Sequence, residues 1–149
     1  MSETGDAKRF EEVEIGERHV SHGRTVSESD VYRYAGLEGH YGELHTNKEK
    51  MKDSEFGGRI AHGVLLVVLT NGFMTKLPFH HSVVALYGLD TVRFVEPVFI
   101  DDTVHLEVEV VDKEPKGDER GIVTYNCELI NQDGKVVMAL QWLYMIRRT

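Results

Sequence analysis

The sequence is poor in cysteine and in long apolar runs. It contains one cysteine, Cys127, which excludes an intrachain disulfide, and it has no Cys-x-x-Cys pair of the kind seen in zinc and redox sites. The longest apolar run, Val64 to Leu69, is far too short to span a bilayer. The first residues, Met1 to Arg9, lack the apolar core of a signal peptide. We therefore expect a cytoplasmic protein with no membrane partner.

Positive charge is also scarce. The sequence has 17 Lys and Arg against 25 Asp and Glu, a net charge of −8. Binding to nucleic acid requires a clustered Lys/Arg surface. The one dense group, Lys48, Lys50 and Lys52, alternates with acidic residues as on a solvated helix face. These features argue against a nucleic-acid partner.

The composition is that of one globular domain. A chain of 149 residues with 41% hydrophobic and 28% charged residues can bury a single core without disulfides or structural metals. No internal repeat, low-complexity segment or linker divides it. We predict a single domain over residues 1–149, with residues 1–9 disordered.

The first half of the chain contains helix signals. His19 to Val26 reads as a strand, and Ser27 followed by Asp30 resembles a capping box at a helix start. Gly36 or Gly39 would end that helix. Lys48 to Lys52 would add a short helical turn.

The segment from His62 to Met74 is almost entirely apolar. Its length and its lack of alternation favour a helix, and a helix that is apolar on all sides is a buried one. Pro78 would stop it.

The rest of the chain predicts strands. Val104 to Val110 alternates as a half-buried strand does, Gly88 suggests a bulge, and Asp133-Gly134 favours a hairpin turn. The other predicted strands are Val83–Tyr87, Leu89–Phe94, Gly121–Ile130 and Val136–Ile146. The pattern predicts an α+β fold in which an antiparallel sheet wraps around one long central apolar helix.

Histidines lie close to the start of that helix. The polar loop Gly39 to His45 carries two imidazoles and precedes the sequence Ile60-Ala61-His62-Gly63. The first N–H groups of a helix have no partner within it, and an imidazole is a good acid/base near neutral pH. Together these groups can move a proton and stabilise an enolate.

Several segments resemble the MaoC-like dehydratases, which include the (R)-specific enoyl-CoA hydratases. The resemblance spans roughly Val20 to Arg147 and implies a hot-dog fold, usually paired into a homodimer. The segments that carry it are Ser27–Val31, Ala35–Gly39, Leu44–Thr46, Phe56–Gly63, Val92–Phe94, Pro97–Val98 and Asp102–Val104.

Members of the hydratase type carry G-D-x-N-P-x-H in the first loop, where the Asp and the His flank the reacting water. The family His corresponds to His45, whereas His40 takes the Asp position and Glu43 the Pro position. Gly63 matches the backbone N–H that holds the thioester oxygen. A small polar residue of the central helix corresponds to Asn71.

The departure from the family loop leaves several roles open. His45 is the first candidate for proton transfer, and His40 either shares that role or serves local structure. Glu43 could supply the missing carboxylate, because residues two apart in an extended segment share a face. His62 would cap or orient the helix start, and Arg59 is a candidate cation on the ligand route.

The resemblance implies a lyase of fatty acid metabolism that reversibly adds water to a trans-2-enoyl-CoA. A non-catalytic acyl-CoA-binding protein and an acyl-CoA thioesterase are the alternatives. No cofactor is expected, because CoA belongs to the substrate. No metal is expected either, because the spacing of His40, Glu43 and His45 fits no helical zinc motif.

Overall fold

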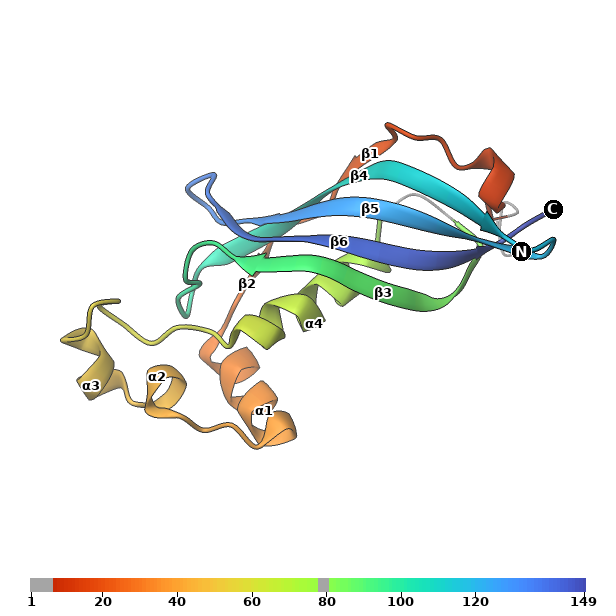
Figure 1. The fold of residues 1–149 in the computed structure, drawn as a ribbon. Helices are drawn as coiled ribbons and strands as arrows, with labels where there is room; N and C mark the ends of the chain where they lie inside the picture. The colour runs from red at the N-terminus through yellow and green to blue at the C-terminus, as the bar shows by residue number, and fades with distance from the viewer. Residues whose placement is uncertain (1–6, 78–80) are drawn as a thin grey trace, which may run out of the picture.

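The computed structural model describes residues 7–77 and 81–149. A curved antiparallel sheet packs against helix α4, and three shorter helices project beyond one end of the sheet (Figure 1). The elements are η1 (Phe10–Glu12), β1 (Arg18–Val20), β2 (Arg24–Thr25), α1 (Glu28–Glu38), α2 (Glu43–Thr46), α3 (Lys48–Lys52), α4 (Gly63–Met74), β3 (Val83–Phe94), β4 (Thr103–Lys116), β5 (Arg120–Ile130) and β6 (Val136–Arg147).

The sheet has the strand order β1-β4-β5-β6-β3, and β2 also pairs with β4. The first eight residues of β4 alternate between partly exposed and buried positions, as the sequence predicts. The β5–β6 hairpin turns at Asp133-Gly134, where Gly134 has a φ of 75° that suits glycine. β3 is one strand rather than two, and its pairing with β6 shifts register between Leu86 and Gly88. The bulge expected at Gly88 is confirmed.

The single strand expected over His19 to Val26 is wrong. The segment forms two short strands, β1 and β2, because Ser21 interrupts the regular pairing. The Ser21 hydroxyl accepts a bond from the Leu106 N–H at 2.8 Å, which replaces a main-chain acceptor. A side chain that competes with the ladder in this way leaves no periodic signal in the sequence.

Helix α1 begins and ends where the sequence indicates. The Ser27 hydroxyl accepts from the Asp30 N–H, and the Asp30 carboxylate accepts from the Ser27 N–H, both at 3.0 Å. Gly39 ends the helix with a φ of 81°. The capping box and the glycine stop are therefore confirmed.

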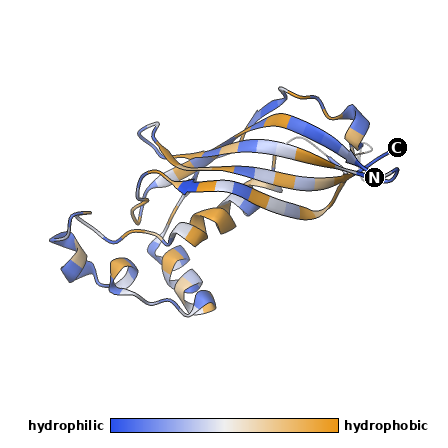
Figure 2. Cartoon of the chain, in the orientation of Figure 1, coloured by the Kyte–Doolittle hydropathy of each residue, from blue (hydrophilic) through white to orange (hydrophobic). Residues whose placement is uncertain are grey.

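Helix α4 begins within one residue of the predicted segment and ends where it was predicted to end, but it is less enclosed than expected. It has 12 residues, and Leu65, Leu66, Leu69 and Phe73 bury one face of it against the sheet. Val64 and Val68 remain 52% and 49% exposed in the single chain. Figure 2 shows the apolar helix beneath the sheet with one side uncovered. The helix is present as predicted, but its expected burial on all sides is wrong for the single chain, because the sheet covers only one side of it.

The start of the chain and the segment after α4 lie together. The backbones of Lys8 and His81 pair in an isolated parallel β-bridge, and the Ser82 hydroxyl donates to the Ala7 carbonyl at 3.0 Å. Residues 7–9 are therefore ordered, while the disorder expected for residues 1–6 lies outside the described residues. Pro78 lies outside them too, and α4 ends before it, at Met74. No helix of the described residues is long and apolar enough to cross a bilayer.

Candidate functional site

Three histidines meet between the projecting helices and the start of α4. His40 follows α1, His45 lies on α2, and His62 is the N-cap of α4. The His45 and His62 rings stack with centroids 3.7 Å apart, and the His40 ring lies edge-on at 5.0 Å from His45 and 5.2 Å from His62. The structure thus brings His62 into one cluster with the two loop histidines.

Hydrogen bonds to backbone carbonyls set the tautomers of the two buried histidines. His45 Nδ1 donates to the Ile60 carbonyl at 2.7 Å, and His62 Nε2 donates to the His40 carbonyl at 3.0 Å. A carbonyl oxygen can only accept, so the proton of each neutral ring is on the bonded nitrogen. The other nitrogen of each ring, His45 Nε2 and His62 Nδ1, then carries a free lone pair. His62 Nδ1 is buried and has no hydrogen-bond partner among the described residues.

The surroundings of His45 favour its neutral form. Burial lowers the pKa of this imidazole below its ordinary value of 6.5, and the nearby His62 and His40 rings lower it further. The hydrogen bond to Ile60 acts in the opposite direction but does not reverse the shift. A neutral imidazole with a free Nε2 can accept a proton from water.

Gly63 directly follows His62 of the cluster in the chain. Gly63 is the first residue of α4, and its N–H has no acceptor among the described residues. A Cβ on Gly63 would lie 3.1 Å from the ring of Phe94. A side chain here would therefore press on Phe94, so glycine keeps the helix start close to β3.

Glu43 lies apart from the cluster. Its carboxylate pairs with Lys50 Nζ at 3.1 Å and accepts from Asn47 Nδ2 at 3.0 Å. Residues 43–46 form helix α2, so residues two apart point to different sides. The expected shared face of Glu43 and His45 is wrong for that reason.

Arg59 and Asn71 also lie away from the cluster. Arg59 pairs with Glu28 at 2.6 Å and donates to the Tyr32 hydroxyl at 3.3 Å, which ties α1 to the segment before α4. Asn71 is exposed and follows His62 by nine residues, a rise of roughly 13 Å along a helix. Asn71 therefore lies on the exposed side of α4 in the single chain.

An open groove of about 300 Å³ lies between α1 and α4. Its lining includes the apolar side chains of Leu37, Leu65, Val68 and Leu69, together with Tyr34. The Tyr34 ring contacts His62 edge-on, with centroids 5.0 Å apart. A larger hollow of about 440 Å³ lies over β4, β5 and β6 and holds none of the predicted site residues. Neither hollow is lined by the three histidines, and Tyr34 is the residue that connects the α1–α4 groove to them.

Comparison with known proteins identifies the family. Residues 11–131 match the MaoC like domain. The chain belongs to this family. Its sheet curved around α4 is the hot-dog fold, which similar solved structures share. The chain is 36% identical to a monoamine oxidase regulatory protein from Archaeoglobus fulgius, with a TM-score of 0.90 and 96% of each chain covered.

Two curated MaoC-like relatives differ in how much of their length this chain spans. It is 34% identical over 132 residues to the (R)-specific enoyl-CoA hydratase of Rhodospirillum rubrum, covering 87% of this chain and 85% of that enzyme. It is 30% identical over 123 residues to Protein MaoC of Klebsiella aerogenes, covering 80% of this chain. The match spans only 36% of that longer protein.

Proposed function

We propose that this protein is an enoyl-CoA hydratase/dehydratase that adds water reversibly to a trans-2-enoyl-CoA. The observation that carries the proposal is the placement of His45 against His62, the residue that precedes the free Gly63 N–H. This arrangement supports a candidate acid/base next to the residue that begins α4. Membership of the MaoC-like family and the relative named as a hydratase support the same reaction class.

The proposed reaction uses three groups of the chain. His45 Nε2 accepts a proton from water, and the resulting hydroxide adds to the β-carbon of the thioester. Electron density moves to the thioester oxygen, where the Gly63 N–H at the positive end of α4 stabilises the enolate. A proton then returns to the α-carbon, with His40 beside His45 as a second imidazole to carry it.

The groove between α1 and α4 supports the proposal that the substrate is a thioester with an apolar acyl chain. Tyr34 connects it to His62, and its lining combines four aliphatic side chains with the charged residues Arg24, Asp30 and Arg33. Sites for such ligands usually combine apolar side chains with a few polar groups. CoA is part of this substrate, so the proposed reaction needs no separate cofactor.

Hydration of crotonyl-CoA tests the proposal. Loss of the absorbance of the conjugated thioester should follow addition of the protein, and a series of longer and branched enoyl-CoA substrates should define the preferred chain. Failure to hydrate any member of the series would disprove the hydratase function. Release of free thiol in the same assays would indicate a thioesterase instead.

A non-catalytic acyl-CoA-binding protein is the second candidate. The observation that favours it is His40 at the position where the family loop has a carboxylate. Calorimetry with saturated and unsaturated acyl-CoA separates the two functions. A binder should hold both ligands and leave the enoyl-CoA unchanged over hours, whereas a hydratase should convert it.

A further inference from the structure

We infer that His40, His45 and His62 form a binding site for a divalent transition metal ion, with Zn²⁺ as the best match. One nitrogen from each of the three rings lies within 4.8 Å of the others, and this is the sole such group of three His, Cys, Asp or Glu side chains in residues 7–77 and 81–149. Three imidazoles with a fourth position open is a common arrangement for zinc in proteins. The sequence spacing could not reveal it, because His62 comes from a separate element.

The two buried rings are already held as metal ligands are. Ligating histidines usually donate their second ring N–H to a carbonyl or a carboxylate, which fixes the tautomer and leaves one lone pair for the metal. His45 does this through Ile60, and His62 through the carbonyl of His40. The free nitrogen of His62 is fully enclosed and lacks a protein partner among the described residues. An ion at the centre of the cluster would satisfy it.

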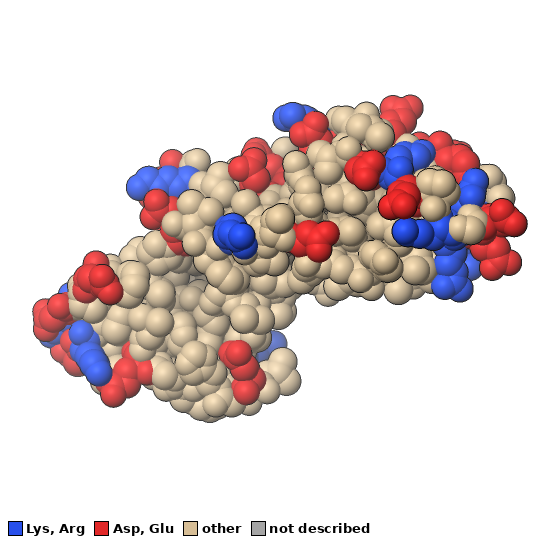
Figure 3. All heavy atoms as spheres, viewed as in Figure 1, with Lys and Arg blue, Asp and Glu red and all other residues tan. Residues whose placement is uncertain are grey.

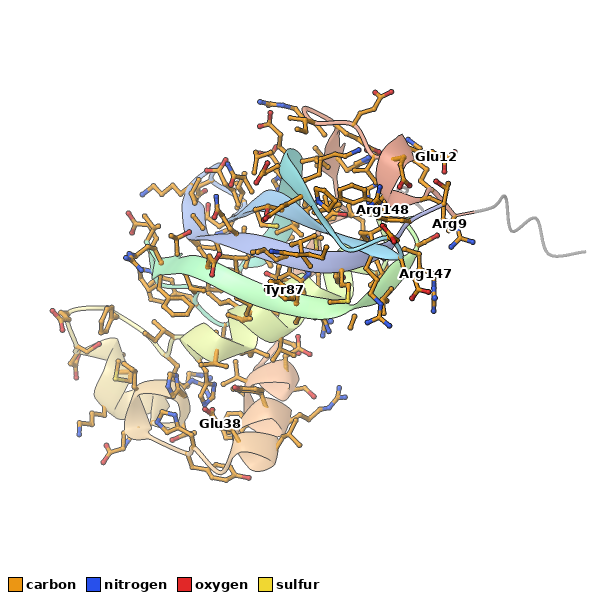
Figure 4. The ribbon with its side chains drawn as sticks, turned by 45° about the vertical axis from the view of Figure 1, so that its right-hand side comes forward. Arg9, Glu12, Glu38, Tyr87, Arg147 and Arg148 are labelled. Carbon is orange, nitrogen blue, oxygen red and sulfur yellow. The ribbon has the colours of Figure 1, made fainter. Side chains whose placement is uncertain are left out.

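His40 supplies the third ligand and the route of entry. Its Nδ1 lies 3.9 Å from a Glu38 carboxylate oxygen, which leaves Nε2 for the metal. Figure 4 shows Glu38 in the region between α1 and the α2–α3 segment. The His40 side chain is 54% exposed, so an ion can reach the cluster from solvent. Ligand type, outer partners and an entry path are thus all present.

Binding requires a small rearrangement of the rings. A tetrahedral ion places its nitrogen ligands about 3.4 Å apart at zinc–nitrogen distances near 2.0–2.1 Å. The His45 and His62 rings are stacked with an angle of 22° between their planes, so one of them has to tilt for both lone pairs to meet at one point. His40 can follow, because its ring is edge-on to both and open to solvent.

Metal binding would also regulate the proposed reaction, a consequence that rests on the proposed function. The ion would take the Nε2 lone pair that His45 needs to accept a proton from water. Zn²⁺ should then inhibit hydration, and a chelator should restore it. The binding inference itself is measured without substrate, so it stands or fails separately from the hydratase activity.

Titration of untagged, chelator-stripped protein with Zn²⁺ in a calorimeter, and with Co²⁺ by visible ligand-field absorption, tests the site. We expect one ion per chain and a Co²⁺ spectrum typical of low coordination number. His40→Ala removes a ligand that is half exposed, so the variant should fold normally while binding falls by about tenfold or more. Gly42→Ala should weaken binding too, because its Cβ would lie 2.8 Å from His40 Nε2 and displace the ring.

The matched control is His105→Gln, which removes a partly exposed histidine of β4 whose ring lies 3.7 Å from Glu107. This variant should bind the ion as the unchanged protein does. Absence of one-to-one binding would overturn the inference. Equal losses in the His40 and His105 variants, or no loss in the His40 variant, would overturn it as well.

Discussion

At the scale of single residues, the Ile60 carbonyl decides what His45 can do. It fixes the proton on Nδ1 and leaves the Nε2 lone pair for the proposed role as base, while burial favours the neutral ring. Replacing His45 with alanine should lower kcat by about 10²–10⁴-fold, the usual contribution of a general acid/base. Steady-state kinetics with crotonyl-CoA would measure the loss. The unpaired Ile60 carbonyl should cost about 1–3 kcal/mol of unfolding free energy.

Glu43→Gln is the matched control for that experiment. Its carboxylate faces Lys50 and Asn47 rather than the cluster, so kcat should stay within about twofold of the unchanged protein. A loss comparable with that of the His45 variant would show that Glu43 enters the site during the reaction.

The pH dependence of activity should respond to residue 40. In the unchanged chain the pKa of His45 lies below 6.5, so the acid limb of the kcat/KM profile should also lie below that value. His40→Asp removes a neighbouring imidazole and adds a carboxylate, which favours the charged form of His45. The acid limb should therefore move to higher pH. An unchanged profile would mean that His45 is not the titrating base.

The sequence predicted only part of the histidine cluster. The loop histidines and Gly63 could be proposed from their distance along the chain, whereas the stacking of His45 on His62 depends on how α2 meets the start of α4. Glu43 was misplaced because four residues are too few to show a helical period. Nothing in the sequence indicated that the His81 side chain is fully buried.

At the scale of elements, the capping box of α1 positions the projecting helices. Ser27→Ala should lower the unfolding free energy by about 1 kcal/mol, because the Asp30 N–H loses its acceptor. Urea denaturation followed by circular dichroism would measure this change. Ser27→Asp restores an acceptor at the cap and should recover most of the loss. Equal stability of all three proteins would show that the cap contributes nothing.

Periodicity predicted most elements, and it failed where tertiary contacts compete with it. The alternation of β4 and the glycine stop of α1 are local features and were confirmed. The division between β1 and β2 depends on a hydroxyl that reaches Leu106, a residue distant in the sequence. The exposed side of α4 reflects what the rest of the fold leaves uncovered. Neither feature could be read from a window of neighbouring residues.

At the scale of the whole molecule, a buried histidine couples folding to pH. Burial lowers the pKa of His81 to about 4, with Lys8 and His19 adding to the effect and Glu17 opposing it. The His81 ring also contacts the Tyr125 hydroxyl at 2.7 Å. Because the unfolded chain binds this proton near pH 6.5, stability should fall as pH drops from 6.5 towards 4, by up to roughly 3 kcal/mol.

Urea unfolding at a series of pH values would measure this dependence. His81→Gln should flatten the curve in that window, even though it lowers stability at neutral pH. His105→Gln should leave the shape of the curve unchanged. If the His81 variant kept the full acid dependence, other groups would have to account for it.

The exposed edge strand β3 predicts that two copies of the chain form a homodimer. Among the described strands, β3 pairs only with β6, and it exposes Leu86, Tyr87 and Phe94. An open edge with apolar side chains is a typical surface for strand pairing between chains. Figure 3 shows charged groups of both signs interspersed on this view, with many gathered near the chain termini. We expect a homodimer through β3, with Phe94 bringing the interface next to Gly63.

Sedimentation velocity would test this assembly. Leu86→Lys should shift the protein towards monomer, because a charge replaces an apolar side chain at the edge. Leu37→Lys changes an exposed leucine of α1 and should leave the dimer intact. A monomer at all concentrations would exclude the expected homodimer.

The bonds from His45 to Ile60 and from His62 to the His40 carbonyl also fasten two parts of the molecule together. One part is the outlying trio of short helices, and the other is the body made by the sheet and its helix. Chemistry and mechanical attachment thus share the same two rings. Any event that reorients the rings should loosen that attachment, which hydrogen exchange of the α2 amides would detect as faster opening.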